Sequence, residues 1–171
     1  ANIFGSLTVV TDRPFSIGDW IKIGEVEGTV EHLGFRSTRI RTFYNSLVAV
    51  PNSLLLTAVV DNLGERTYRR YSTKLTITYD TSPEKIEAFC EGVRDIIKQH
   101  PQTRKDYFQV YFNDFSDSSL DVLLYCFFEV PDWGAELAAR HDLLMSIVKC
   151  ASGLGVEFAY PTQRLFLEKE T

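Results

Sequence analysis

The chain has 171 residues, enough for one ordinary domain or two small ones. Hydrophobic residues make up 44% and charged residues 24%, a balance that is typical of a folded globular protein and excludes a disordered chain. The formal net charge of −5 argues against a nucleic-acid-binding protein, which usually carries a basic stripe or patch.

The cysteines and the apolar stretches further limit the kinds of protein that this chain can be. The sequence has three cysteines, Cys90, Cys126 and Cys150, an odd number, and no two of them have Cys-x-x-Cys spacing. We therefore predict buried thiols in a reducing compartment, without a disulfide or a zinc site. No run of about 18 apolar residues is long enough to span a bilayer. Because the chain begins without methionine inside the apolar stretch 3–10, we expect it to be a fragment of a longer protein.

The first third reads as a small β domain. Runs rich in β-branched and aromatic residues alternate with turn residues at a spacing of about 8–12, which is typical of a small all-β sandwich or barrel. Pro51-Asn52 ends the last run, and Asn52 is predicted to cap a short helical turn over 53–56. The predicted strands are 19–23, 28–33, 35–42 and 47–50.

From residue 67 the sequence predicts longer strands and helices. Alternation at 74–79 predicts a strand, and Ser82-Pro83 followed by apolar residues three or four apart predicts a helix over 83–99. The order β-α-β-β-α-β is that of a ferredoxin-like unit. The remaining predicted elements are strands at 107–114 and 119–130, a helix at 133–152, a strand at 156–160 and a separate strand at 164–168.

The residues that carry chemistry are scattered. His32, His100 and His141 lie far apart, no Cys/His cluster has metal-ligand spacing, and no phosphate loop or nucleophile elbow is present. We therefore predict no enzyme, no cofactor and no metal, and interpret the histidines as surface or packing residues.

An acidic set, Asp114, Asp117 and Asp121, could suggest a divalent cation, but it lacks the glycine and the terminal glutamate of a calcium loop. A solvated hairpin turn is the favoured interpretation. The strand at 119–130 is apolar on both faces, which predicts that something covers its second face, either the β domain or a neighbouring subunit.

A basic cluster follows the second predicted strand. In a strand, Arg39 and Arg41 share one face with Ser37, while Arg36 and Ile40 share the other. Two interpretations stay open: a solvated or salt-bridged strand face, and a ring of positive charge that lines an assembly.

Four blocks in the first third carry a resemblance. In order along the chain, they resemble the middle β domain of small-conductance mechanosensitive channels. The later β-α-β-β-α-β order also agrees with that family, so the resemblance covers nearly the whole chain. One departure is the turn Tyr44-Asn45-Ser46, where family members often have Asp-Gly or Asn-Gly. The blocks are Arg13-Pro14-Phe15-Ser16-Ile17-Gly18-Asp19-Trp20-Ile21-Lys22-Ile23, Glu27-Gly28-Thr29-Val30-Glu31, Arg36-Ser37-Thr38-Arg39-Ile40-Arg41-Thr42 and Val48-Ala49-Val50-Pro51-Asn52-Ser53.

The resemblance implies an α+β fold class. It implies a remnant of the pore-lining transmembrane helix at 1–12 and a Sm-like middle β barrel domain at 13–66. A ferredoxin-like α/β domain at 67–161 and a C-terminal strand at 162–171, which contributes to an oligomeric barrel, complete the expected organisation.

The resemblance also implies a function. The chain would be the cytoplasmic vestibule domain of a mechanosensitive channel at the inner membrane, which releases solutes on osmotic downshock. Its partners would be six further copies in a homoheptamer, inorganic ions and small solutes, with no nucleic acid, and with the membrane reached only through missing N-terminal helices. The vestibule candidates are Arg36, Arg39 and Arg41. The gate-coupling or motif candidates are Asn2, Gly18, Asp19, Gly28, Pro51 and Asn52.

Two other functions compete with the channel. A Sm-like RNA-binding ring requires a basic, aromatic surface, which an acidic chain with a large second domain does not favour. An enzyme on the ferredoxin-like unit, such as a small phosphatase, requires an arginine-bearing phosphate loop that the sequence lacks.

Overall fold

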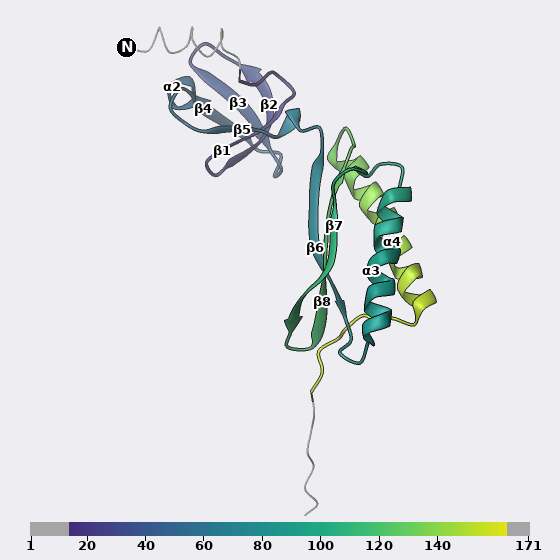
Figure 1. The fold of residues 1–171 in the computed structure, drawn as a ribbon. Coiled ribbons are helices and arrows are strands. Elements are labelled where there is room, and N and C mark those ends of the chain that lie inside the picture. Colours follow the sequence, from purple (N-terminus) through teal and green to yellow (C-terminus); the bar gives the residue numbers. More distant parts are fainter. Residues whose placement is uncertain (1–13, 164–171) are drawn as a thin grey trace, which may run out of the picture. The chain divides into compact units, whose positions relative to one another are not determined.

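The computed structural model describes residues 14–163 (Figure 1). The chain divides into two compact units, and the boundary in the sequence lies between Thr67 and Tyr68. The first unit is a β-sheet with one short helix, and the second is a smaller sheet with two long helices on one face. The predicted α+β fold class is confirmed.

The first unit is an antiparallel five-stranded sheet with the order β4-β3-β2-β1-β5. Its small core is formed by residues such as Ile21, Val30 and Ile40, each of which is almost completely buried. Within residues 14–163, β4 and β5 do not pair with each other, so the predicted barrel is an open sheet here. The strands are β1 (Trp20–Ile23), β2 (Val26–Leu33), β3 (Ser37–Thr42), β4 (Leu47–Pro51) and β5 (Val60–Asn62).

Two backbone positions shape this sheet. A Cβ on Gly28 would lie 2.1 Å from the main-chain oxygen of Arg41, so β2 and β3 approach each other more closely there than a side chain allows. Asn45 has a φ of 62° in the β3–β4 turn, a left-handed conformation that asparagine tolerates better than most residues. The unusual Tyr44-Asn45-Ser46 turn therefore reverses the chain without a glycine.

The prediction that Asn52 caps a helix was wrong. Helix α2 (Asn52–Leu55) has Pro51 at its N-cap and no side-chain cap hydrogen bond. The Asn52 side chain points into the unit, where it has better partners than the helix terminus. The three-residue strand β5 and the following 3₁₀ turn η1 (Leu63–Glu65) were also not predicted, because the run at 60–62 is too short to show alternation.

The second unit has the three-stranded antiparallel order β6-β8-β7. The connectivity agrees with a ferredoxin-like unit, but the predicted fourth strand is reduced to one bridge between Ile77 and Phe158. Its elements are β6 (Arg69–Ile77), α3 (Pro83–Gln99), β7 (Gln109–Ser116), β8 (Ser119–Phe128) and α4 (Trp133–Leu154).

Helix α3 has the predicted bounds, whereas α4 begins as predicted and extends two residues beyond its predicted end, through Gly153 to Leu154. The Ser82 side chain accepts a hydrogen bond from the Lys85 amide at the start of α3, and His100 ends that helix. Asp132 accepts from the Ala135 amide at the start of α4, and Gly155 ends it with a φ of 62°.

Both helices pack on one face of the sheet. The alternate residues of β8 that face them, from Leu120 to Phe128, are buried. All three cysteines are free thiols; Cys90 and Cys126 are buried as predicted, whereas Cys150 is only partly buried. On the opposite face, Arg104 stacks on Tyr107 and Phe127 at 5.7 and 5.8 Å from the ring centroids. Residues of the second unit itself therefore cover part of the apolar face of β8 that points away from the helices.

Some predictions fall outside the described residues. These are the helix remnant at 1–12 with Asn2, and the separate strand at 164–168. Among residues 14–163, no helix is both long enough and apolar enough to cross a membrane.

Candidate functional site

The arginine cluster lies on β3 and just before it. Ser37, Arg39 and Arg41 point to the outer face of the sheet, as predicted, while Thr38 and Ile40 are buried on the other. Arg36 does not share the buried face with Ile40, because it precedes the strand and is exposed. All three arginines are therefore on the surface of the first unit.

Arg41 is held in an ion pair. Its Nε donates to Glu31 Oε1 at 2.7 Å and an Nη donates to Glu31 Oε2 at 2.9 Å, a two-pronged contact between β3 and β2. The other Nη donates to the main-chain oxygen of Asn45 at 3.0 Å. The hydrogen bond to Arg41 lowers the pKa of Glu31, and the same bond raises the pKa of Arg41. The pair carries no net charge.

Arg36 and Arg39 differ from Arg41. Both are exposed, and neither forms an ion pair with any residue in the 14–163 range. The salt-bridged interpretation of the cluster therefore holds for Arg41, while Arg36 and Arg39 are exposed and have no ion-pair partner among the described residues.

Asn52 fixes the loop from which Arg36 projects. Its side-chain nitrogen donates to the main-chain oxygens of Gly34 at 2.9 Å and Phe35 at 3.2 Å, and its side-chain oxygen accepts from Thr38 Oγ1 at 3.0 Å. Its main-chain amide donates to the oxygen of Arg36 at 3.0 Å. With Pro51 turning the chain into α2, Asn52 thus acts as a buried positioning residue, a role that sequence reasoning misread as a helix cap.

Gly18 and Asp19 hold the entry to β1. Gly18 has a φ of 97°, and its amide donates to the main-chain oxygen of Val30. Asp19 Oδ2 accepts from the Ser16 amide at 2.8 Å and from Asn62 Nδ2 at 2.9 Å. These motif residues join the start of β1 to β2 and β5, so their roles here are structural.

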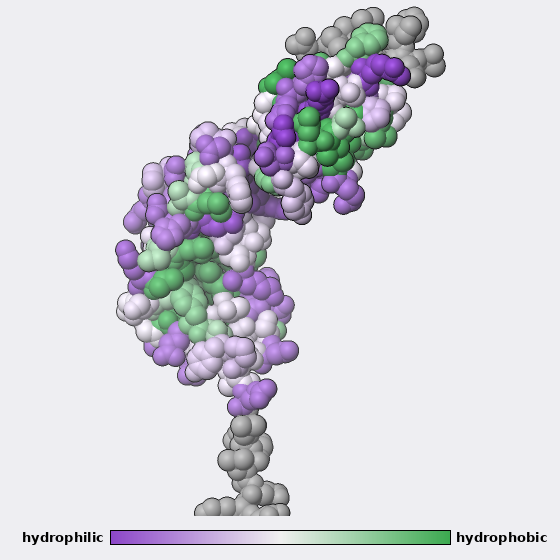
Figure 2. All heavy atoms as spheres, turned by 180° about the vertical axis from the view of Figure 1, so that it is seen from behind, coloured by the Kyte–Doolittle hydropathy of each residue, from purple (hydrophilic) through white to green (hydrophobic). Residues whose placement is uncertain are grey.

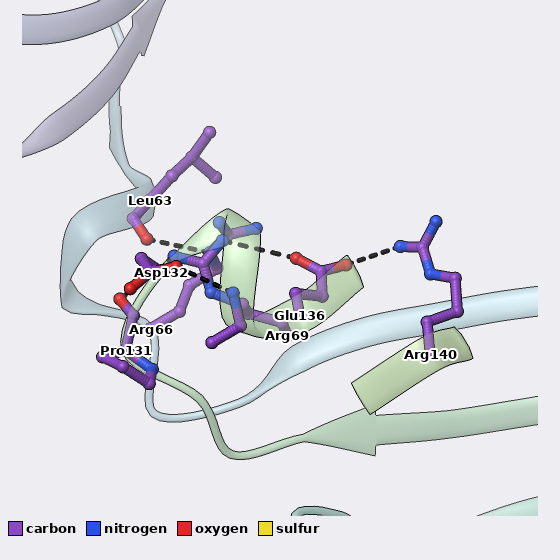
Figure 3. A network of polar contacts seen from close by, with 8 residues as sticks. Leu63, Arg66, Arg69, Pro131, Asp132, Glu136 and Arg140 are labelled. Atoms are coloured by element: carbon purple, nitrogen blue, oxygen red, sulfur yellow. Dashed lines mark hydrogen bonds and ion pairs between the residues drawn. The ribbon is translucent and has the colours of Figure 1, made fainter. Parts of the chain in front are cut away.

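The second unit contains a buried charge network that the sequence did not reveal. Glu136 lies between Arg69 on β6 and Arg140 one turn along α4 (Figure 3). The Glu136 and Arg69 side chains are each only 10% exposed, and the Arg140 guanidinium lies 4.4 Å from the centroid of the Tyr71 ring. The i, i+4 spacing of Glu136 and Arg140 was the available signal, but the pairing with Arg69 crosses 67 positions.

The two outer strands of the first sheet are the remaining feature. In the described part of the chain, β4 pairs only with β3, and β5 pairs only with β1. Each leaves one side of its backbone without a strand partner, and exposed Leu47 and Val59 flank these edges. The arrangement can accept a further strand on either side.

The site offers little for catalysis. Among residues 14–163, no group of three or more His, Cys, Asp or Glu side chains could hold a metal ion. Asp114, Asp117 and Asp121 do not form such a group, because Asp121 is buried and its carboxylate is bound by Lys74, Ser116 and Ser119.

Comparison with known proteins identifies the family. The family described as "Mechanosensitive ion channel, beta-domain" matches residues 1–65, and "Mechanosensitive ion channel MscS, C-terminal" matches residues 72–158. The chain belongs to the MscS family of mechanosensitive ion channels. Members of this family are channels and not enzymes, in agreement with the prediction from sequence.

Curated relatives match along the whole chain. The low conductance mechanosensitive channel YnaI of Escherichia coli is 39% identical over 100% of this chain and 50% of its own length. The small-conductance mechanosensitive channel MscMJ of Methanocaldococcus jannaschii is 36% identical over 99% of this chain and 48% of its length. The chain therefore spans about half the length of these relatives.

Solved structures share the fold. A cryo-EM structure of Arabidopsis thaliana MSL1 A320V has a TM-score of 0.85 at 24% identity and covers 94% of this chain and 60% of that one. The crystal structure of Helicobacter pylori MscS in its closed state has a TM-score of 0.83 at 22% identity and covers 99% of this chain and 65% of that one.

Proposed function

We propose that this chain is the cytoplasmic vestibule part of a mechanosensitive channel, on the inner face of the membrane, which releases solutes on osmotic downshock. The observation that carries the proposal is the open five-stranded sheet, whose two outer strands have no further strand partner within residues 14–163, in a chain of the MscS family. The function requires several copies around one pore, and the sheet offers a means to assemble them.

The edges suit a ring. If β5 of one copy pairs with β4 of the next, every copy uses two different edges, and repeated rotation closes the assembly without a leftover edge. The proposed ring is a homoheptamer. In it, residues 1–12 end the pore helix, 13–66 form the ring, 67–161 form the cage wall and 162–171 join a small barrel. Asn2 couples the pore helix to the β domain.

The exposed arginines Arg36 and Arg39 would bias which ions approach the pore. Uncompensated charges on the wall of a vestibule change the local concentration of ions of opposite sign. We propose that Arg36 and Arg39 contribute this bias, while Arg41 does so little because Glu31 neutralises it.

This difference is testable in the full-length channel. Arg39→Gln is expected to shift the reversal potential in a salt gradient towards cation preference. The double variant Glu31→Gln/Arg41→Gln removes a neutral pair and is expected to leave the reversal potential unchanged. An equal shift in both variants would contradict the assignment.

Ring assembly is tested by cross-linking across the two edges. Ala49 on β4 and Asp61 on β5 are exposed. In the full-length protein in membranes, Ala49→Cys/Asp61→Cys is expected to give an oxidant-dependent ladder of bands that ends at seven copies. The matched control is Thr29→Cys/Asp61→Cys, since Thr29 is exposed on the central strand β2. Links in the control alone, or in neither variant, would overturn the edge-to-edge ring.

A further inference from the structure

We propose, on the basis of the ring above, that neighbouring α/β units also pack side by side, with an aromatic pair of one copy in an apolar groove of the next. The aromatic pair is Phe112 and Phe115 on β7. The groove, called here the α4 groove, lies between the C-terminal half of α4 and residues 155–158.

The aromatic pair is exposed on an edge strand. The two rings meet edge to face with centroids 5.1 Å apart, and Phe115 is 68% and Phe112 38% exposed. As far as the described residues show, β7 pairs only with β8. Large aromatic side chains that lie together on a surface are characteristic of the centres of protein interfaces.

The α4 groove is a shallow hollow of about 440 Å³ whose lining is more apolar than polar. Exposed Leu137 and Val148, with half-buried Leu144 between them, continue the apolar surface along α4. Figure 2 shows apolar residues gathered over the middle of this unit in the view from behind. The groove is lined by Val148, Ala151, Ser152, Gly155, Val156, Glu157 and Phe158.

The two surfaces lie on opposite sides of the unit. Helix α3 covers the β7 side of the sheet, where an Arg94 Nη donates to the main-chain oxygen of Val110 at 2.6 Å. Helix α4 covers the β6 side, through Glu136 with Arg69 and Arg140 over Tyr71. Because the sheet order is β6-β8-β7, the aromatic pair and the α4 groove are separated by the full width of the sheet.

The surfaces also lie at the same level along the strands. Phe115 pairs with Leu120, Leu120 pairs with Ile77, and Ile77 bridges to Phe158 at the groove. These four residues form one row across the sheet. A copy related by rotation about an axis roughly parallel to the strands would therefore present its groove to Phe115 with no shift along the strands.

This geometry and the charges favour a second copy as the occupant. A protruding surface and a hollow one on opposite sides are the two halves of a head-to-tail contact, which closes into a ring under rotation. Asp114 and Asp117 are exposed on the side of the aromatic pair. Lys149 is exposed on α4, and Lys85 Nζ bonds the main-chain oxygen of Gly155 at 2.9 Å, although Glu157 also lines the groove.

The test is a cysteine pair across the proposed contact. In the full-length protein in membranes, Phe115→Cys/Val148→Cys is made in a Cys150→Ala background, because Cys150 is only partly buried. An oxidant is expected to produce a ladder that ends at the same closed ring as the Ala49→Cys/Asp61→Cys pair. Phe115→Cys/Ser72→Cys is the control, since Ser72 is exposed on the outer face of β6 and is expected to stay unlinked.

The outcomes separate this inference from the proposed function. If the Ala49/Asp61 pair closes the ring but the Phe115/Val148 pair does not link, the side-by-side contact is wrong and the ring of β domains stands. If Phe115→Cys alone gives a dimer as efficiently as the double variant, the aromatic pair meets its own counterpart and the head-to-tail contact is overturned. If neither pair links, both proposals fail.

Discussion

Among residues 14–163, the core of the first unit contains seven buried hydrophobic residues and that of the second contains seventeen. With so small a core, the first unit depends on individual residues: Gly28 allows two strands to approach, and Asn52 ties the β2–β3 loop to α2. The second unit spreads its stability over long helices and a sheet. Motif residues in the first unit are therefore mainly structural. In the part of the chain that the structure describes, its sheet edges have no partner strand, and exposed Arg36 and Arg39 have no ion pair.

The largest loss of stability is expected from substitution of Gly28. In Gly28→Ala the new methyl group would lie 2.1 Å from a main-chain oxygen of β3, which cannot move away as a flexible side chain could. The free energy of unfolding of the first unit should fall by about 3 kcal/mol or more, measured by urea denaturation. Gly153→Ala is the control, because a Cβ there meets no atom within 4 Å and should change stability by less than about 1 kcal/mol. Equal effects would contradict the close approach of β2 and β3.

Glu136→Gln tests whether the stability of the second unit also depends strongly on one residue. The substitution removes the negative charge that Arg69 and Arg140 share, in a site where the Glu136 side chain is only 10% exposed. We expect a loss of about 3 kcal/mol in the unfolding of the second unit, followed by circular dichroism. Glu91→Gln, at an exposed ion pair, should cost less than about 1 kcal/mol. A negligible loss at Glu136 would mean that the network contributes little.

Asn52→Ala should destabilise the first unit by about 2 kcal/mol, because Thr38 and two main-chain oxygens lose their buried partner. The loop that carries Arg36 should also become more mobile, which amide hydrogen exchange at residues 34–36 would detect. Ser53→Ala, at the exposed neighbouring position, should leave both stability and exchange unchanged. Unaltered exchange in Asn52→Ala would refute its positioning role.

Asp121 is expected to give the clearest pH dependence of stability. Hydrogen bonds from Lys74, Ser116 and Ser119, with that from Lys74 the strongest, lower the pKa of Asp121 from 3.8 to about 2. Since the folded-state pKa is the lower one, the carboxylate stabilises the second unit above about pH 4, and this contribution is lost as the pH falls towards 2.

Asp121→Asn should therefore flatten the loss of stability between pH 4 and pH 2 that the parent protein shows in urea titrations at each pH. Asp117→Asn, at an exposed position of the adjacent turn, should keep the parent slope. If Asp121→Asn retained that slope, another carboxyl group would be responsible.

The sequence predicted the second unit better than the first. Helix α3 follows from Ser82-Pro83 and an apolar repeat of three or four, which are local signals. The role of Asn52 depends on Gly34 and Phe35, and the role of Glu136 depends on Arg69, so neither could be read from neighbouring residues. Local pattern likewise could not show that Arg41 is paired with Glu31 while Arg39 is not, because the partner comes from another strand.

The most direct test of the account is a pressure-clamp recording of the full-length channel in membrane patches. We predict current evoked by membrane tension, and we predict that locking the edges through Ala49→Cys/Asp61→Cys leaves assembled channels in the membrane. A full-length protein that assembles as a ring and gives no current under tension would contradict the proposed mechanosensitive function.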